Sequence, residues 1–235
     1  MKILKFIPAL LLFIQFNSYS NTPHFQESVL FIGDSQTEGY LGEMTYDFLM
    51  DDKRVGKIAL YGVGSSSPRH WADARGSKNS EWLCQRKARY NNQLRVNLTQ
   101  NLCPPNKEGS IFQHLNEKKP ELVVFQFLGN SMGFSESYIH DKVQMLLAKM
   151  EDHQRCLFIT SPPYYKELVE KNKLRLKTQD YIAKAAGSRC KIILGYTNTS
   201  YPKFAMERDN YLSDRIHLSK KGALLFFNMF KEYLK

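Results

Sequence analysis

Five short apolar runs recur along the chain, separated by longer stretches that are polar or amphipathic. They occupy residues 29–32, 57–61, 122–127, 157–160 and 192–196. Runs of this composition are typical of strands that are buried on both faces. When such strands alternate with helices, they form a parallel sheet with helices on each side. We therefore expect an α/β fold with five parallel strands.

The segments between the runs contain three stretches with helical character, at residues 138–151, 165–186 and 220–233. The last is strongly apolar on one side, so we expect it to pack against the sheet. The chain has 235 residues, of which 43% are hydrophobic. This length and composition predict a single domain, which we place at residues 21–235.

The first twenty residues have the pattern of an export signal. Lys2 and Lys5 precede an apolar stretch at 6–16, and small residues follow at 18–20. The apolar stretch is shorter than the ~20 residues that span a membrane. We therefore expect residues 1–20 to be a signal peptide, the mature protein to be periplasmic or secreted, and no transmembrane anchor. A buried amino-terminal helix is the alternative.

The four cysteines form an even set, as expected for a protein that folds in an oxidising compartment. Three pairings are possible. Cys156 and Cys190 each open an apolar run, so they would lie at the amino ends of strands that can be parallel neighbours. That pairing leaves Cys84 and Cys103 as the second disulfide.

The formal net charge is +10, which favours contact with polyanions. No helix-turn-helix, RNP or zinc-finger pattern is present, so we do not expect a nucleic-acid partner. For an exported protein, an anionic polymer of the cell envelope is the candidate partner.

The regular pattern stops between residues 65 and 119, after the second expected strand. This segment contains Cys84 and Cys103, several arginines, Trp71 and Trp82. Long irregular segments of this kind often serve as lids or binding loops. We expect a disulfide-tied insertion or lid over the carboxyl edge of the sheet, in which the tryptophans either stack on sugar rings or fill a core. A surface decoration without a specific role is the alternative.

The first apolar run ends in Gly33-Asp34-Ser35, which places a serine hydroxyl where a strand gives way to a helix. Unpaired amides and the helix dipole favour negative charge at such a point. Ser35 is therefore a candidate nucleophile. The alternative is that Asp34 or Ser35 only caps the helix.

Asp214 and His217 precede the last expected helix, at the edge of the sheet where the first strand also ends. Residues three apart on a turn point the same way. His217 can then act as general base for Ser35, with Asp214 orienting the imidazole.

With these motifs, the chain resembles the SGNH, or GDSL, hydrolases, from about residue 28 to its end. The resemblance implies a flavodoxin-like three-layer αβα sandwich, with Ser35 as nucleophile and Asp214 and His217 as acid and base. It also implies an oxyanion hole made from the Ser35 amide, a glycine amide after the second strand and an asparagine side chain after the third.

Two further sequence blocks supply candidates for that oxyanion hole. In the segment at 61–68 we favour the Gly64 amide, while a shifted alignment would select Ser65 or Gly62. A dinucleotide fingerprint is disfavoured there because the third glycine is absent. In the other block Asn130 is retained, although the family pattern Gly-x-Asn-Asp is altered by Leu128 and Ser131.

Together these features predict an exported serine esterase that removes O-acetyl groups from a carbohydrate. The alternatives are a lipid acyl esterase or phospholipase, an acyltransferase on the same fold, and a non-catalytic binder of anionic polymers. The substrate would be an acylated small molecule or polysaccharide. The mechanism requires no cofactor, no metal motif is present, and we expect a monomer.

Overall fold

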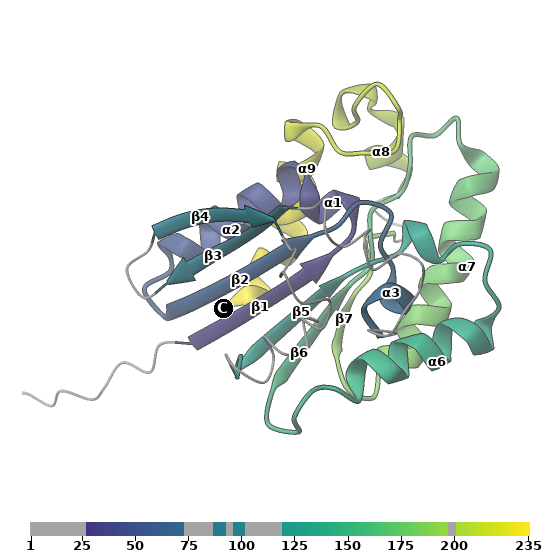
Figure 1. Cartoon of the computed structure of the whole chain (residues 1–235). Coiled ribbons are helices and arrows are strands. Elements are labelled where there is room, and N and C mark those ends of the chain that lie inside the picture. The colour runs from purple at the N-terminus through teal and green to yellow at the C-terminus, as the bar shows by residue number, and fades with distance from the viewer. Residues whose placement is uncertain (1–26, 73–86, 93–95, 102–118, 197–200) are drawn as a thin grey trace, which may run out of the picture.

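The computed structural model describes residues 27–72, 87–92, 96–101, 119–196 and 201–235 (Figure 1). Within these ranges the chain forms one mixed sheet with helices on both faces. The segment at 1–20 that we interpret as an export signal lies outside the described residues, as do Cys84, Cys103 and Trp82.

The sheet has seven strands in the order β4-β3-β2-β1-β5-β6-β7. Its core is the predicted five-stranded parallel sheet, formed by β1 (Glu27–Gly33), β2 (Val55–Gly62), β5 (Leu122–Gln126), β6 (Arg155–Ile159) and β7 (Lys191–Ile193). Because β1 lies between β2 and β5, the strand order reverses direction at β1. In open α/β sheets, binding sites lie at the carboxyl ends of the strands beside such a reversal.

Helices cover both faces of this sheet, as Figure 1 shows. Leu30 and Ile32 of β1 belong to one hydrophobic cluster, and Val29 and Phe31 to a second cluster on the other face. This two-sided burial explains why the strands appear in the sequence as uninterrupted apolar runs. The first cluster includes α3 (Pro68–Ala72), α6 (Glu136–Leu147) and α7 (Val169–Ala186), and the second includes α2 (Tyr40–Asp51) and α9 (Lys220–Phe230). The three-layer αβα architecture is therefore confirmed.

The remaining elements are short. They are α1 (Ser35–Glu38), α8 (Tyr201–Met206) and the 3-10 helices η1 (Gly129–Ser131), η2 (Arg208–Asn210) and η3 (Lys231–Leu234). No helix among the described residues has both the length and the apolar character needed to cross a membrane.

The expectation of irregular structure throughout 65–119 is wrong in part. Strands β3 (Lys87–Asn92) and β4 (Val96–Asn101) form an antiparallel hairpin that extends the sheet beyond β2. Their sequences are polar and offer no apolar run to detect. Residues 73–86, 93–95 and 102–118 lie outside the described residues, so a lid stays a prediction.

A disulfide joins Cys156, near the start of β6, to Cys190, immediately before β7. This is the pairing predicted from the position of both cysteines at the amino ends of neighbouring parallel strands. The bond therefore lies at the opposite end of the sheet from the carboxyl ends of the strands.

Candidate active site

Ser35 is the first residue of α1, which starts directly after β1. The Asp34 carboxylate caps this helix by accepting a hydrogen bond from the Gln36 amide at 2.9 Å. The helix packs closely onto the end of β2, where a Cβ atom on Gly62 would lie 2.3 Å from the Glu38 nitrogen. The capping alternative thus holds for Asp34, while the Ser35 side chain remains available for another role.

Ser35, His217 and Asp214 lie in one hydrogen-bonded row. His217 Nε2 is 2.8 Å from Ser35 Oγ, and His217 Nδ1 is 2.5 Å from Asp214 Oδ2. The structure thus brings Ser35 together with the Asp214 and His217 pair, from which about 180 positions separate it in the sequence. This is the order of groups that a serine nucleophile, a general base and an orienting carboxylate require.

Asp214 also organises the turn that carries His217. Its Oδ1 atom accepts hydrogen bonds from the Ile216 and His217 amides at 2.9 and 3.0 Å. Partial burial raises the pKa of Asp214, but the hydrogen bonds from the His217 side chain and these two amides outweigh that effect, so the pKa lies below its ordinary value. The carboxylate is therefore ionised at neutral pH and can stabilise a protonated imidazole.

Gln36, which the sequence did not mark as a site residue, ties the His217 turn to the nucleophile. Its Nε2 atom donates to the Ile216 carbonyl at 3.0 Å, and its Oε1 atom accepts from the Leu218 amide at 3.2 Å. Both partners are immediate neighbours of His217. A single buried side chain next to Ser35 therefore fixes the backbone on each side of the candidate base.

Asn130 lies in η1, which begins three residues after the end of β5, the strand that the sequence placed before it. Its Nδ2 atom donates to the Ser66 carbonyl at 2.9 Å, which holds the amide against the loop that follows β2. An amide nitrogen carries two hydrogens, so one remains for a further acceptor. Asn130 lines the same cavity as Ser35.

The Gly64 amide is not available in this structure as the second oxyanion donor, the role we favoured for it from the sequence. It donates to Glu38 Oε2 at 2.7 Å. The next residue, Ser65, is exposed at the cavity with φ 62°, and no described residue accepts a hydrogen bond from its N–H. The shifted alignment that selects Ser65 therefore fits the geometry better, because the Glu38 carboxylate already engages Gly64.

A buried polar network lies beneath the nucleophile. Thr37 Oγ1 donates to Gln126 Oε1 at 2.7 Å, Gln126 Nε2 donates to Ser161 Oγ at 2.6 Å, and the Ser161 hydroxyl donates to Asp34 Oδ2 at 3.4 Å. Burial raises the pKa of Asp34 to about 6, although amide hydrogen bonds and the charge of Arg175 act in the opposite direction. The carboxyl group next to the candidate nucleophile therefore titrates close to neutrality.

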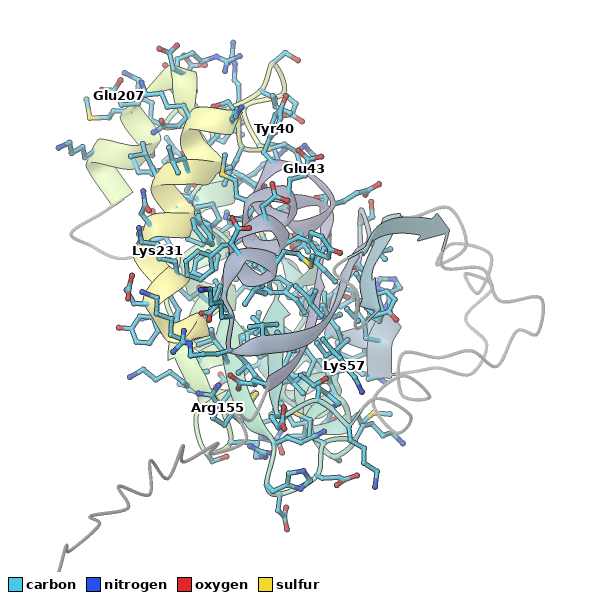
Figure 2. The ribbon with its side chains drawn as sticks, turned by 90° about the vertical axis from the view of Figure 1, so that its left-hand side faces the viewer. Tyr40, Glu43, Lys57, Arg155, Glu207 and Lys231 are labelled. Atoms are coloured by element: carbon cyan, nitrogen blue, oxygen red, sulfur yellow. A yellow bond between two sulfur atoms is a disulfide. The ribbon has the colours of Figure 1, made fainter. Side chains whose placement is uncertain are left out.

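A cavity of about 690 Å³ opens over Ser35. In Figure 2, Tyr40 and Glu43 of α2 lie at one end of the molecule, whereas Lys57 and Arg155, from the starting ends of β2 and β6, lie at the other. Tyr40 and Glu43 both line the cavity, which is therefore at the end where the parallel strands finish. Its mouth has an exposed aromatic ring at Tyr40 and an exposed apolar side chain at Leu212, and its inner part includes Tyr164 and Arg175.

Trp71, also noted in the sequence, has a structural role. Trp71 is only 3% exposed and packs near Tyr61 and Phe127, so the core alternative holds and Trp71 does not stack on a sugar ring. No group of three or more potential metal ligands occurs in the part of the chain that the structure describes.

Comparison with known proteins shows a fold relationship without close sequence similarity. No protein-family model matches the chain, and no curated protein sequence matches it. Among solved structures, a point variant of an acetyl-xylooligosaccharide esterase from Geobacillus has a TM-score of 0.58 at 12% identity, covering 88% of this chain and 93% of the other. A lipase/acylhydrolase from Enterococcus faecalis has a TM-score of 0.57 at 13% identity, covering 89% and 95%. A member of the lipolytic G-D-S-L family from Veillonella parvula has a TM-score of 0.54 at 13% identity, covering 87% and 96%.

Proposed function

We propose that this chain, which has the fold of the SGNH hydrolases, is a serine ester hydrolase that removes O-acetyl groups from a carbohydrate outside the cytoplasm. The observation that carries the proposal is the row formed by Ser35, His217 and Asp214 at the carboxyl end of the parallel sheet. On this fold, a serine next to an oriented imidazole and to amide donors has the parts needed for acyl transfer.

In the acylation step, Ser35 Oγ attacks the ester carbonyl carbon while His217 Nε2 accepts the hydroxyl proton. Asp214 keeps the other ring nitrogen protonated and stabilises the imidazolium. The tetrahedral intermediate collapses by cleavage of the bond to the alcohol oxygen, which takes the proton back from His217. The products of this step are the free alcohol and an acyl-Ser35 ester.

The negative oxygen of the intermediate requires donors that are already in place. We assign this role to the Ser35 amide, the Ser65 amide and the second Nδ2 hydrogen of Asn130. A single donor of this kind contributes about 3 to 4 kcal/mol to lowering the barrier. The hydrogen bond from Asn130 to the Ser66 carbonyl ties the Asn130 side chain to the loop that contains Ser65, so these two donors are held in one arrangement.

In the deacylation step, water attacks the acyl-enzyme with His217 again as base, which releases the carboxylic acid and restores Ser35. A sugar hydroxyl in place of water would make the protein an acyltransferase. Product analysis with an added polyol distinguishes the two: a hydrolase releases free acetate, and a transferase forms a new ester at the expense of acetate.

Two observations support the proposed substrate class: the size of the cavity and the solved structures of similar fold. A cavity of about 690 Å³ is far larger than an acetyl group, which leaves room for a bulky alcohol. The exposed Tyr40 ring at its mouth can stack on a sugar face. One of the similar structures is an acetyl-xylooligosaccharide esterase, which supports the same chemistry on this chain.

The export part of the proposal is supported by the signal-like pattern at residues 1–20 and by the Cys156–Cys190 disulfide. Expression with the native amino terminus, followed by sequencing of the mature protein, tests it. A mature protein that begins near Asn21 supports export, and a cytoplasmic product that retains Met1 contradicts it.

The hydrolase proposal is tested by comparing acetylated oligosaccharides with long-chain acyl esters as substrates, using wild type and Ser35→Ala. We expect acetate release from the oligosaccharide and its loss in the variant. A preference for long chains would replace the carbohydrate assignment with a lipid esterase. Equal turnover by wild type and Ser35→Ala would refute the serine mechanism, and persistent polymer binding in that case would favour a non-catalytic binder.

A further inference from the structure

Arg175, near the middle of α7, is a fully buried cation at the inner wall of the cavity that contains Ser35. Only 1% of its surface is exposed. Its guanidinium lies 3.9 Å from the centre of the Tyr164 ring, and Nη2 donates to the Pro162 carbonyl. Its Nε atom has no hydrogen-bond partner. A charge buried with so few partners destabilises a fold unless another interaction offsets the loss of hydration.

One such interaction is with the turn that carries Asn130. A Cβ atom on Gly129 would lie 2.9 Å from Tyr164 Oη and 3.2 Å from Arg175 Nη1. The guanidinium and the phenol therefore pack directly against the backbone of Gly129. A side chain at this position would press on both groups, so glycine immediately before Asn130 lets them pack closely.

A second interaction is with Asp34, the residue immediately before Ser35. The buried Asp34 carboxyl accepts hydrogen bonds from the Gln36 and Leu128 amides and from the Ser161 hydroxyl. It thereby connects the Ser35 turn to the strand end that leads into η1. The positive charge of Arg175 lowers the pKa of Asp34, and the Asp34 charge acts in turn on Arg175. No carboxylate in the described ranges lies within salt-bridge distance of Arg175, so this attraction acts across the buried interior.

We propose that Arg175 is a positioning residue for the proposed esterase reaction: packed against Gly129, its guanidinium holds the Asn130 turn in place next to the Asp34 carboxyl that caps the Ser35 turn, so that the donors of both turns converge on one oxyanion. The inference rests on the proposed function. It assigns to Arg175 no contact with the substrate. Arg175 influences the reaction through its charge interaction with Asp34 and through its packing against Gly129.

The first test does not need activity. It measures the free energy of unfolding of wild type, Arg175→Met, Asp34→Asn and the double variant between about pH 4 and pH 8. The other charged or titratable groups that face Asp34 or Arg175 are His217, Tyr164 and Tyr211, and all are present in the four proteins. We expect the destabilisation caused by Arg175→Met to grow as the pH rises through the titration of Asp34, because the ionised carboxylate then loses its counter-charge.

In the Asp34→Asn background the same substitution should cause a destabilisation that does not change with pH. A pH-independent loss in both backgrounds would mean that Arg175 only fills space, and would overturn the electrostatic half of the proposal. If Arg175→Met does not fold, Arg175→Gln takes its place in the comparison, because it also removes the charge while keeping an amide that can donate to the Pro162 carbonyl.

The second test is kinetic and uses an acetate ester that wild type turns over. We expect Arg175→Met to lower kcat by about 10- to 100-fold, with KM changed by less than about threefold, because misplaced oxyanion donors affect the transition state more than the bound substrate. Lys171→Met, which removes an exposed charge one turn earlier on α7, is the matched control and should leave both constants unchanged.

Gly129→Ala tests the contact between Gly129 and Arg175 by changing the glycine instead of the arginine. Its new methyl group would press on Tyr164 Oη and on Arg175 Nη1, so we expect a loss of kcat that is partly restored when combined with Arg175→Lys. A kcat for Arg175→Met within about threefold of wild type, per folded molecule, would overturn the positioning role. Wild-type protein without any esterase activity would instead refute the proposed function, and the unfolding measurements would still decide whether Arg175 and Asp34 are coupled.

Discussion

Gln36 illustrates how one side chain joins two distant parts of the candidate site. Its amide group bonds to the backbone on both sides of His217, although 180 and 182 positions separate the partners. The sequence around Gln36 does not predict this role, because a glutamine after a candidate nucleophile is usually an ordinary surface residue. The site therefore depends on residues that have no part in bond making.

We predict that Gln36→Met, which keeps the length of the side chain but not its hydrogen bonds, leaves the Ile216 carbonyl and the Leu218 amide unpaired. The expected loss of stability is about 1 to 3 kcal/mol. Movement of His217 should lower kcat by about 10- to 100-fold. Gln144→Met is the control, because Gln144 bonds to the Ala185 carbonyl far from the cavity. Equal kcat in the two variants would show that Gln36 does not position His217.

The raised pKa of Asp34 gives a prediction with a definite sign. A carboxyl group whose pKa is about 6 in the folded protein and 3.8 in the reference state favours folding when protonated. Its contribution is fully present below the lower value and is lost as the pH rises through the upper one. Relative to Asp34→Asn, wild type should therefore lose about 3 kcal/mol of stability between pH 3 and pH 7. Chemical denaturation at several pH values measures this, and a difference that is constant or grows in favour of wild type with pH contradicts it.

At the scale of elements, α1 can lie over the end of β2 only because glycine occupies the contact. A Cβ atom on Gly62 would approach the Glu38 nitrogen to 2.3 Å and the Thr37 carbonyl carbon to 2.6 Å. Both atoms belong to the backbone of α1, so the helix itself would have to move. The position of Ser35 therefore depends on the absence of a side chain on the neighbouring strand.

Gly62→Ala should destabilise the fold by about 1 to 3 kcal/mol through overpacking and should lower kcat by displacing α1. Gly39→Ala serves as the control for stability, because its Cβ would lie 3.6 Å from the nearest atom, the Ser35 carbonyl oxygen. Thermal melts of both variants, with kcat for Gly62→Ala, provide the measurement. A Gly62→Ala variant as stable and active as wild type would show that α1 has more room than these contacts allow.

The parts of the fold predicted from the sequence are those that depend on local pattern. The buried strands appear as apolar runs, and Cys156 and Cys190 lie where two of those runs begin. Helix α2 was missed because Gly42 interrupts its helical signal, and that glycine is required by contact with the Thr37 carbonyl oxygen at 1.8 Å from a Cβ atom. Strands β3 and β4 were missed because they are polar.

In the candidate site, too, some features depend on local sequence pattern and others on tertiary contacts. The motifs around Ser35, Asn130, Asp214 and His217 can be recognised from short stretches of sequence. The occupation of the Gly64 amide by Glu38 depends on tertiary contact, and so does the burial of Arg175, a residue type that is rarely buried.

For the whole molecule, the disulfide and the cavity lie at opposite ends of the parallel sheet. Cys156 and Cys190 are at the amino ends of neighbouring strands, whereas Ser35, Asn130 and Ser161 follow the carboxyl ends of theirs. The disulfide is therefore far from the candidate active site. Changes at one end can be tested without touching the other.

Replacing both Cys156 and Cys190 with alanine should lower the free energy of unfolding by about 3 to 4 kcal/mol, because a loop of this size gains entropy in the unfolded chain. The kcat of the protein that remains folded should not change. Denaturant titration and active-site-normalised kinetics measure the two quantities. A large loss of kcat at full folding would mean that the bond also shapes the cavity.

The central claim is that Ser35 is a nucleophile activated by His217. Labelling with a fluorophosphonate, followed by peptide mapping and measurement of the labelling rate, tests it most directly. We predict a single adduct on Ser35, absent in Ser35→Ala and formed at least about 100-fold more slowly in His217→Gln. Folded protein that is not labelled, or that is labelled elsewhere or at a rate independent of His217, would contradict the account.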